Sequence, residues 1–273
     1  MKINQVLNLY ERGYRNFSGI DLSGANLAGV TLIGVDFSKA NFRGANLSRA
    51  FLTKSNFSEA ILNWADLSYV KMSEADLTKA DLTKANLLGA FMVKSKLNEA
   101  KLCGANISHT NLRLANLEAA NLCGAKLQKV NLRQANLEKV NFDWANLKEG
   151  RLSRACLSNI SLNQVNLSRT FLRDVDLSGA NLEGINLSHA RLNGANLTQT
   201  KLRFANLTEA LLNNANLQNA DLSGANLLGA RLIRANLTNA ILAKANLTDV
   251  DFQDAVINNT ILESSELAST QIG

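Results

Sequence analysis

The sequence predicts an all-β fold in which one chain coils many times around a single axis, and three observations predict it. Every fifth residue from Phe17 to Ile272 is Leu, Phe, Met or Ile, which gives 52 consecutive positions without an exception. The residue two places earlier is Ala in 31 of these 52 units, and the residue one place earlier is Asn or Asp in 31 of them. Similar residues also recur at spacings of 20 or its multiples.

The period of five fits neither a helix nor a continuous strand. Five residues turn an α-helix by about 500°, so the apolar positions would form no stripe. On a strand, an odd period would send alternate apolar residues to opposite faces. A chain that bends once per unit A-[ND]-L-x-x resolves the conflict, because Ala and Leu then point inward and the two x residues form a corner. Gly, Ser, Thr, Asn and Lys predominate at the x positions, as a corner requires.

The spacing of 20 indicates four units in each coil. The matching residues are Phe17, Phe37 and Phe57; Met72 and Met92; Cys103 and Cys123, in two LCGA segments; and Trp64 and Trp144, which are 80 residues apart. Stacked coils of four five-residue sides would place the members of each set in one column.

Tandem A-[ND]-L-x-x units, as in Ala25-Asn26-Leu27 and Ala225-Asn226-Leu227, resemble the pentapeptide repeat family over residues 16–272. The resemblance implies a right-handed quadrilateral, that is four-sided, parallel β-helix of about 13 coils, with the central Leu or Phe and the preceding Ala inside. At ~4.8 Å per coil such a rod is ~60 Å long. The opening LNLYERGYRNFSGIDLSGANL is similar to the start of cyanobacterial members.

The chain divides into a short N-terminal segment, residues 1–15, and the repeat region, residues 16–273. Ile3, Val6, Leu7 and Tyr10 have the spacing of an amphipathic helix that stops at Gly13. We expect this helix to cap the first coil and cover its open edges, as the ends of solenoids require. The last residues, LESSELASTQIG, predict no such helix, so we expect a monomer or an end-to-end dimer.

Composition narrows the class of protein. The 29 Lys and Arg residues against 23 Asp and Glu give a net charge of +6. Three cysteines without CxxC spacing do not make a secreted disulfide scaffold. Glu11 and Arg12 stand where a signal peptide needs an apolar run, and no window approaches ~18 apolar residues. These features predict a cytoplasmic protein that does not enter a membrane.

The sequence predicts no enzyme, and no catalytic, cofactor-binding or metal-binding residues. A four-sided rod is expected to be convex, whereas active sites need a concave place where different functional groups converge. His109 and His189 would lie four coils, or ~19 Å, apart and could not share a metal. Asn outnumbers Asp before Leu, so these residues favour hydrogen bonding along the wall over acid–base chemistry.

One side of the predicted coil departs from the repeat and is basic. We name it the Arg side: residues 111–115, 131–135 and so on every 20 residues to 231–235. It carries eight arginines against one acid, Asp174. The candidate partner-binding residues are Arg113, Arg133, Arg151, Arg154, Phe171, Arg173, Arg191, Leu211, Arg231 and Arg234. Because repeat proteins bind along surfaces that run over several repeats, this side predicts a partner with an acidic surface.

Two other interpretations stay open for the surface. The Arg side can be a solvated basic face that promotes solubility. Trp64, Trp144 and Phe204 share one corner column and are either binding anchors or scattered rings that pack on neighbouring corners.

Three functions follow from these patterns. The leading hypothesis is a non-catalytic scaffold that binds a protein partner through the Arg side, as the resemblance to cyanobacterial members that bind regulators also implies. A second is protection of gyrase, a type II topoisomerase, by DNA mimicry, for which similar family members present acidic surfaces. The third, direct nucleic-acid binding by the Arg side, is less favoured because the side offers few stacking rings.

Overall fold

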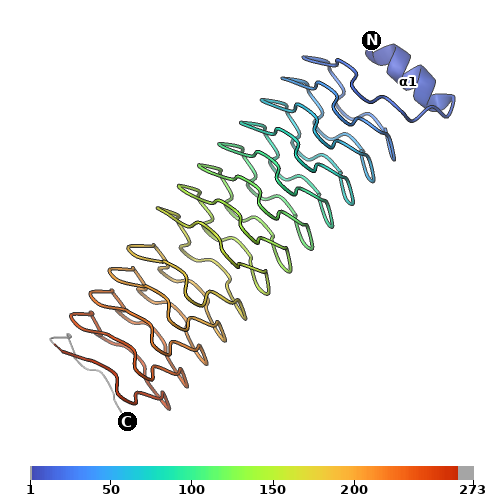
Figure 1. Ribbon diagram of the computed structural model, residues 1–273. Coiled ribbons are helices and arrows are strands. Elements are labelled where there is room, and N and C mark those ends of the chain that lie inside the picture. Colours follow the sequence, from blue (N-terminus) through green and yellow to red (C-terminus); the bar gives the residue numbers. More distant parts are fainter. Residues whose placement is uncertain (1, 264–273) are drawn as a thin grey trace.

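The computed structural model describes residues 2–263, which form a rod of stacked coils with one helix at its start (Figure 1). The residue before each central apolar residue pairs in parallel with the residue 20 positions later, as Asn16 pairs with Asp36 and Asp21 with Asn41. This pairing confirms the 20-residue coil, and its four pairing positions per coil define four walls. The units centred on Leu267 and Ile272 lie outside the described residues.

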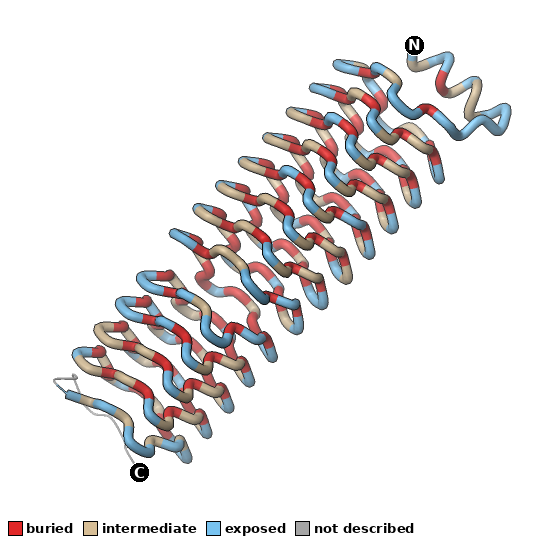
Figure 2. The backbone as a smooth tube through the Cα atoms, in the orientation of Figure 1, coloured by how far each residue is buried: buried red, intermediate tan, exposed pale blue. Residues whose placement is uncertain are grey.

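The interior of the rod is a continuous stack of apolar side chains. From Leu27 to Leu247 no central residue of a unit is more than 9% exposed. Figure 2 shows buried residues recurring at regular intervals along every coil. The rings of Phe17, Phe37, Phe42 and Phe57 pack together near the first coils, with centroids 5.1 to 5.7 Å apart. The core is therefore axial, and each coil buries its apolar residues against the coils above and below.

Each corner is a tight turn that places its second x residue in the left-handed region. At Phe37–Ala40, the N–H of Ala40 donates to the carbonyl of Phe37 over 3.1 Å, and the φ of Lys39 is 58°. This conformation costs a residue other than Gly roughly 1–2 kcal/mol. The N–H of Lys39 donates to the carbonyl of Ser58 on the next coil over 2.8 Å, so inter-coil bonding holds the corner in place.

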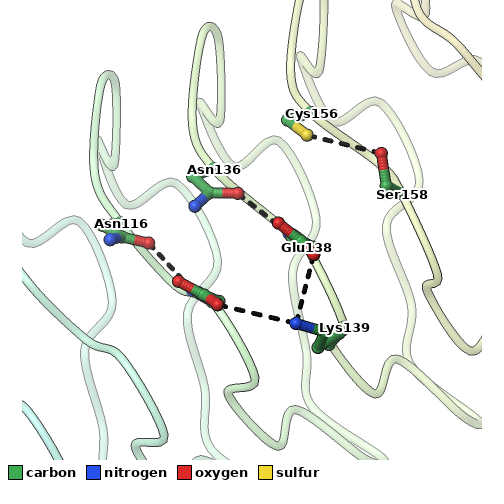
Figure 3. Close-up of polar contacts among 7 residues, drawn as sticks. Asn116, Asn136, Glu138, Lys139, Cys156 and Ser158 are labelled. Carbon is green, nitrogen blue, oxygen red and sulfur yellow. Dashed lines mark hydrogen bonds and ion pairs between the residues drawn. The ribbon is translucent and has the colours of Figure 1, made fainter.

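The Asn or Asp before each central residue stabilises the turn that follows it. The side-chain oxygens of Asn116 and Asn136 accept hydrogen bonds from the N–H groups two residues later, over 3.0 and 3.1 Å (Figure 3). Similar residues also bond along the rod, since Asn106 Nδ2 donates to Asn86 Oδ1 over 3.1 Å. These bonds explain why the unit selects Asn or Asp at this position.

Helix α1 (Ile3–Glu11) lies at the N-terminal end of the rod (Figure 1). Its Val6 is fully buried in the same apolar cluster as the coils. The Tyr10 hydroxyl accepts a hydrogen bond from the N–H of Ile33 over 3.1 Å, and the Arg15 guanidinium lies 3.9 Å from the centre of the Tyr10 ring. Gly13 follows the helix with a φ of 91°, which favours glycine.

The ladder between coils is interrupted once within residues 16–261, and we name this interruption the seam. The pairs 156/176 and 161/181 are absent, whereas the pairs Arg151–Phe171 and Asn166–Asn186 on the other two walls are kept. N–H groups without an inter-coil acceptor include those of Leu157, Asn159, Leu162, Gln164, Asp176 and Asn181. Figure 1 shows wider coil spacing on one side of the rod there, in the yellow part of the chain.

The sequence departs from the repeat at the seam in two ways. Four successive Ala positions hold the larger side chains of Ile160, Val165, Thr170 and Val175, a run that occurs nowhere else in the described chain. This run coincides with the interruption of the ladder. In addition, Cys156 stands where the two preceding coils have Asn, and its Sγ lies 3.6 Å from the Ser158 hydroxyl (Figure 3).

The segment after Ile160 is bonded to the coil before it. Asp143 Oδ1 accepts hydrogen bonds from the Ser161 hydroxyl over 2.6 Å and from the N–H of Asn163 over 3.0 Å. Burial raises the pKa of Asp143, but the hydrogen bonds from Ser161 and Asn163 outweigh it, so the pKa lies below its ordinary value. The seam therefore opens towards the C-terminal half, which lacks such an anchor.

Cys103 and Cys123 lie at matching corners of adjacent coils, and we expect an oxidant to link them. Lys101 pairs with Asn121, and the N–H of Gly104 donates to the Cys123 carbonyl over 2.9 Å, so the two corners are in register. Burial and then the neighbouring Cys123 thiol raise the pKa of Cys103 to about 11. Since the thiolate is the reactive form, the link should form slowly at pH 7 and faster as the pH rises.

Peptide mass mapping after mild oxidation checks this expectation. The exposed Cys156 should react first with a thiol reagent, and Cys123→Ser should abolish the link. Failure to form a 103–123 link at any pH up to 10 would contradict the register of these corners.

Candidate binding surface

The ten candidate residues lie along one wall of the rod. Pairing runs without a break from Asn111 through Arg151 and Phe171 to Arg231, so the Arg side is one continuous surface. All eight arginines are exposed, whereas Phe171 and Leu211 are half-buried. The wall thus presents cations to solvent around two apolar side chains.

Ion pairing divides the arginines into two groups. Asp174 Oδ2 lies 3.5 Å from the Nε atoms of both Arg154 and Arg173, and Arg234 Nε lies 3.5 Å from Asp254. The other five have no ion pair with any residue between 2 and 263: Arg113, Arg133, Arg151, Arg191 and Arg231. All eight were candidates from the sequence, and these five are the ones that form no ion pair within residues 2–263.

Phe171 lies between two of these unpaired arginines. The guanidinium of Arg191 is 4.7 Å from the centre of the Phe171 ring, and that of Arg151 is 5.9 Å away. Such cation–π contacts hold the guanidinium groups over the ring and leave their N–H groups free to bind carboxylate or phosphate oxygens. The arrangement is a preformed cationic group with an apolar centre.

Two clefts border Phe171 and Arg191, so the expectation of a wholly convex rod is wrong. One has a volume of about 660 Å³ and the other about 620 Å³. The larger cleft is also lined by His109 and His189, which the sequence analysis separated by four coils. Long side chains that project from successive corners flank these spaces. The course of the backbone alone does not predict such clefts.

The larger cleft is cationic. Lys129 is paired with Glu149 at 3.6 Å, but Arg151, Arg169 and Arg191 have no acidic partner in the described chain. His189 Nδ1 lies 3.2 Å from Glu209. No group of three or more His, Cys, Asp or Glu side chains within residues 2–263 is arranged to hold a metal ion.

The smaller cleft contains an acceptor that lacks a donor. The side-chain oxygens of Asn193 and of Asn213 are buried without a hydrogen-bond partner, and Asn193 lines this cleft. A buried acceptor left unpaired costs about 1–3 kcal/mol.

Sequence reasoning missed several residues of this surface. Arg169 and Lys129 stand at the corner beside the Arg side and line the larger cleft. Phe51, Lys71 and Phe91 belong to the same column as Phe171, because pairing continues from Phe51 through Phe91 to Asn111. Both Phe rings are exposed, and Lys71 Nζ lies 4.5 Å from the Phe51 ring centre. Extending the column of 20 to the first coils would have found them.

The corner column of Trp64, Trp144 and Phe204 is a set of separate rings. Trp64 and Phe204 carry cation–π contacts with Arg43 at 4.9 Å and Arg203 at 5.6 Å. A Cβ placed on Gly224 would lie 2.7 Å from the Phe204 ring, which shows that this ring covers the glycine of the next coil. These contacts favour packing along the rod over a joint binding site.

Between residues 2 and 263 no helix combines the length and the apolar composition needed to cross a membrane.

Comparison with known proteins agrees with the repeat. The family model described as pentapeptide repeats matches in eight copies, which together cover residues 20–58 and 60–267. Comparison with curated proteins gives no match.

Among solved structures, HetL from the cyanobacterium Nostoc sp. strain PCC 7120 is 34% identical, with 97% of this chain and 96% of HetL covered and a TM-score of 0.31. The pentapeptide repeat protein alr5209 from Nostoc is 28% identical over 44% of this chain and 80% of its own, with a TM-score of 0.22. QnrB1, a plasmid-mediated fluoroquinolone resistance protein, is 18% identical over 64% and 88%, with a TM-score of 0.46. On the family match and the identity to HetL, the chain belongs to the pentapeptide repeat family.

Proposed function

We propose that this protein is a non-catalytic interaction scaffold of the cytoplasm, a right-handed β-helix of about 13 coils, that binds an acidic partner protein through the Arg side. The observation that carries the proposal is the set of five unpaired arginines on one wall, two of which flank the half-buried Phe171. Planar guanidinium groups bind carboxylates in bidentate fashion, and a partly desolvated aromatic ring between them is typical of interface anchors.

The relation to HetL supports a scaffold. HetL is described as involved in the regulation of heterocyst differentiation, and a regulator acts through other molecules. The walls are consistent with this conclusion, because polar side chains such as those of Asn116 and Asn136 are used in the hydrogen bonds of the turns. Residues 1–15 act in this proposal as the cap of the rod, since α1 buries Val6 against the first coils.

Gyrase protection by DNA mimicry is not favoured. Such a protein needs acidic side chains along the rod to replace phosphates, whereas the Arg side presents five unpaired cations. A supercoiling assay with gyrase and a quinolone separates this alternative from the scaffold.

Neutralising the unpaired arginines tests the proposal. In one variant Arg113, Arg133, Arg151, Arg191 and Arg231 are changed to Gln. A matched variant changes five exposed lysines on other walls to Gln: Lys39, Lys101, Lys126, Lys148 and Lys201. We expect the melting temperature of both to stay near that of the parent, because exposed charges contribute little to stability.

Binding should separate the two variants. The partner captured from native lysate should bind the arginine variant at least tenfold more weakly, while the lysine variant should keep most of the affinity. Binding to the parent should also weaken as salt shortens the Debye length. Equal affinity of both variants would contradict the proposal, and a nucleic acid as the captured partner would replace it with the third hypothesis.

A further inference from the structure

We propose that the seam binds an extended polypeptide segment of another protein, one in which small and leucine side chains alternate with polar ones. The seam lies on two walls, neither of which is the Arg side, so its residues are distinct from those of the proposed scaffold surface. Its occupant is inferred from the hydrogen-bonding groups and the side chains that the seam exposes.

The backbone at the seam has unpaired hydrogen-bonding groups. Along 156–164 and 176–181 the two rims present N–H and carbonyl groups that elsewhere bond from coil to coil. They recur at the spacing of a β-ladder, and another extended backbone supplies both donors and acceptors at that spacing. An unpaired strand edge is a template for such pairing.

A cleft lies between the two coils at the seam. It has a volume of about 360 Å³ and is lined by Leu157–Ile160 and Asp176–Asn181. Leu157 and Leu177 keep only 5% and 3% of their surface exposed, but Ile160 and Ala180 are partly exposed, although the same position is buried in the other coils from Ala40 to Ala240. A segment with the pattern of this chain's own units would place Ala and Leu against this opened interior and a polar residue outward.

The walls beside the seam remain bonded, whereas no backbone hydrogen bond joins 156–164 to 176–183. The N–H of Leu152 still donates to the Phe171 carbonyl, and that of Leu167 to the Asn186 carbonyl, both over 2.9 Å. The two halves of the rod can therefore pivot about these walls. An added strand paired with both rims needs a separation of two ladder spacings, ~9.6 Å, and no bond on the seam walls opposes this opening.

Amide hydrogen exchange with a synthetic probe tests the site. The probe is a ten-residue peptide with two copies of Ala-Asn-Leu-Ser-Gly. One control peptide has the same composition in scrambled order, and a second carries Pro in place of Asn, which removes the N–H donor at that position. In the free protein we expect 157–164 to exchange faster than the equivalent segment 137–144, whose ladder is intact.

With saturating probe, exchange in 157–164 and 176–181 should slow by about tenfold or more, and 137–144 should not change. The two control peptides should have no effect. The variant Ile160→Ala, Val165→Ala, Thr170→Ala and Val175→Ala restores the repeat and should close the seam, so its amides should be protected without peptide. The arginine variant described above should bind the probe like the parent, which separates this site from the Arg side.

Three results would overturn the proposal. In the first, 157–164 is already as protected as 137–144 in the free parent. In the second, the probe leaves exchange at the seam unchanged. In the third, protection appears without peptide and grows with protein concentration, which would assign the seam to a second copy of this chain.

Discussion

Leu127→Asp is expected to unfold the middle of the rod. Leu127 is fully buried, and its column places it between Ile107 on one coil and Leu147 on the next. The substitution removes an apolar side chain worth about 2–5 kcal/mol and leaves a carboxyl group whose burial costs several kcal/mol more. Because typical domains are stable by only about 5–15 kcal/mol, this loss should melt the adjoining coils. In a solenoid, stability depends on neighbouring repeats, so the damage should spread from residue 127.

Thermal melting followed by circular dichroism, with limited proteolysis, measures this effect. We expect a large fall in melting temperature and cleavage within 107–147. Leu127→Met is the control, since a change that nearly conserves volume usually costs less than about 1.5 kcal/mol. A melting temperature for Leu127→Asp within a degree or two of the parent would show that residue 127 does not point inward.

The second large effect is expected for Phe37→Ala at the N-terminal end. Phe37 is fully buried and its ring contacts those of Phe17, Phe42 and Phe57, at centroid distances of 5.7, 5.1 and 5.3 Å. Truncation of a buried Phe costs about 3–5 kcal/mol, and lost ring contacts add about 0.5–1.5 kcal/mol for each pair. The first coils and the packing of α1 should therefore be lost before the rest of the rod.

Chemical denaturation of Phe37→Ala and Phe37→Leu separates the two contributions. Leucine occupies this position in most units, so Phe37→Leu keeps an apolar side chain in the interior and loses only the ring contacts. We expect the leucine variant to retain most of the free energy of unfolding. Equal losses in both variants would mean that ring contacts, and not the filling of the interior, stabilise this end.

The 20-residue coil could be predicted from the sequence because the pattern of apolar and polar residues recurs in every unit. Leu127 and its equivalents share one environment, and the period of 20 was visible in Phe17, Phe37 and Phe57. The same period could also have predicted the ion pairs, since Arg154 and Asp174 are 20 residues apart, as are Arg234 and Asp254.

The seam and the clefts could not be predicted in this way. A single branched residue at an Ala position is tolerated, as Val130 shows with its ladder intact on both sides. The interruption coincides with four such residues in succession, a run that a unit-by-unit interpretation does not register. The clefts around Phe171 depend on the directions that long side chains take from the corners, and the repeat pattern does not specify these directions.

The seam also gives the rod a preferred place to bend. Two walls stay bonded there, so bending or pulling forces meet less resistance than at any other contact between coils from residue 16 to residue 261. The two halves can then bend relative to each other about the two bonded walls. These walls include Arg151 and Phe171. A load on the ends of the rod would thus be converted into a change in spacing among the cations of the Arg side.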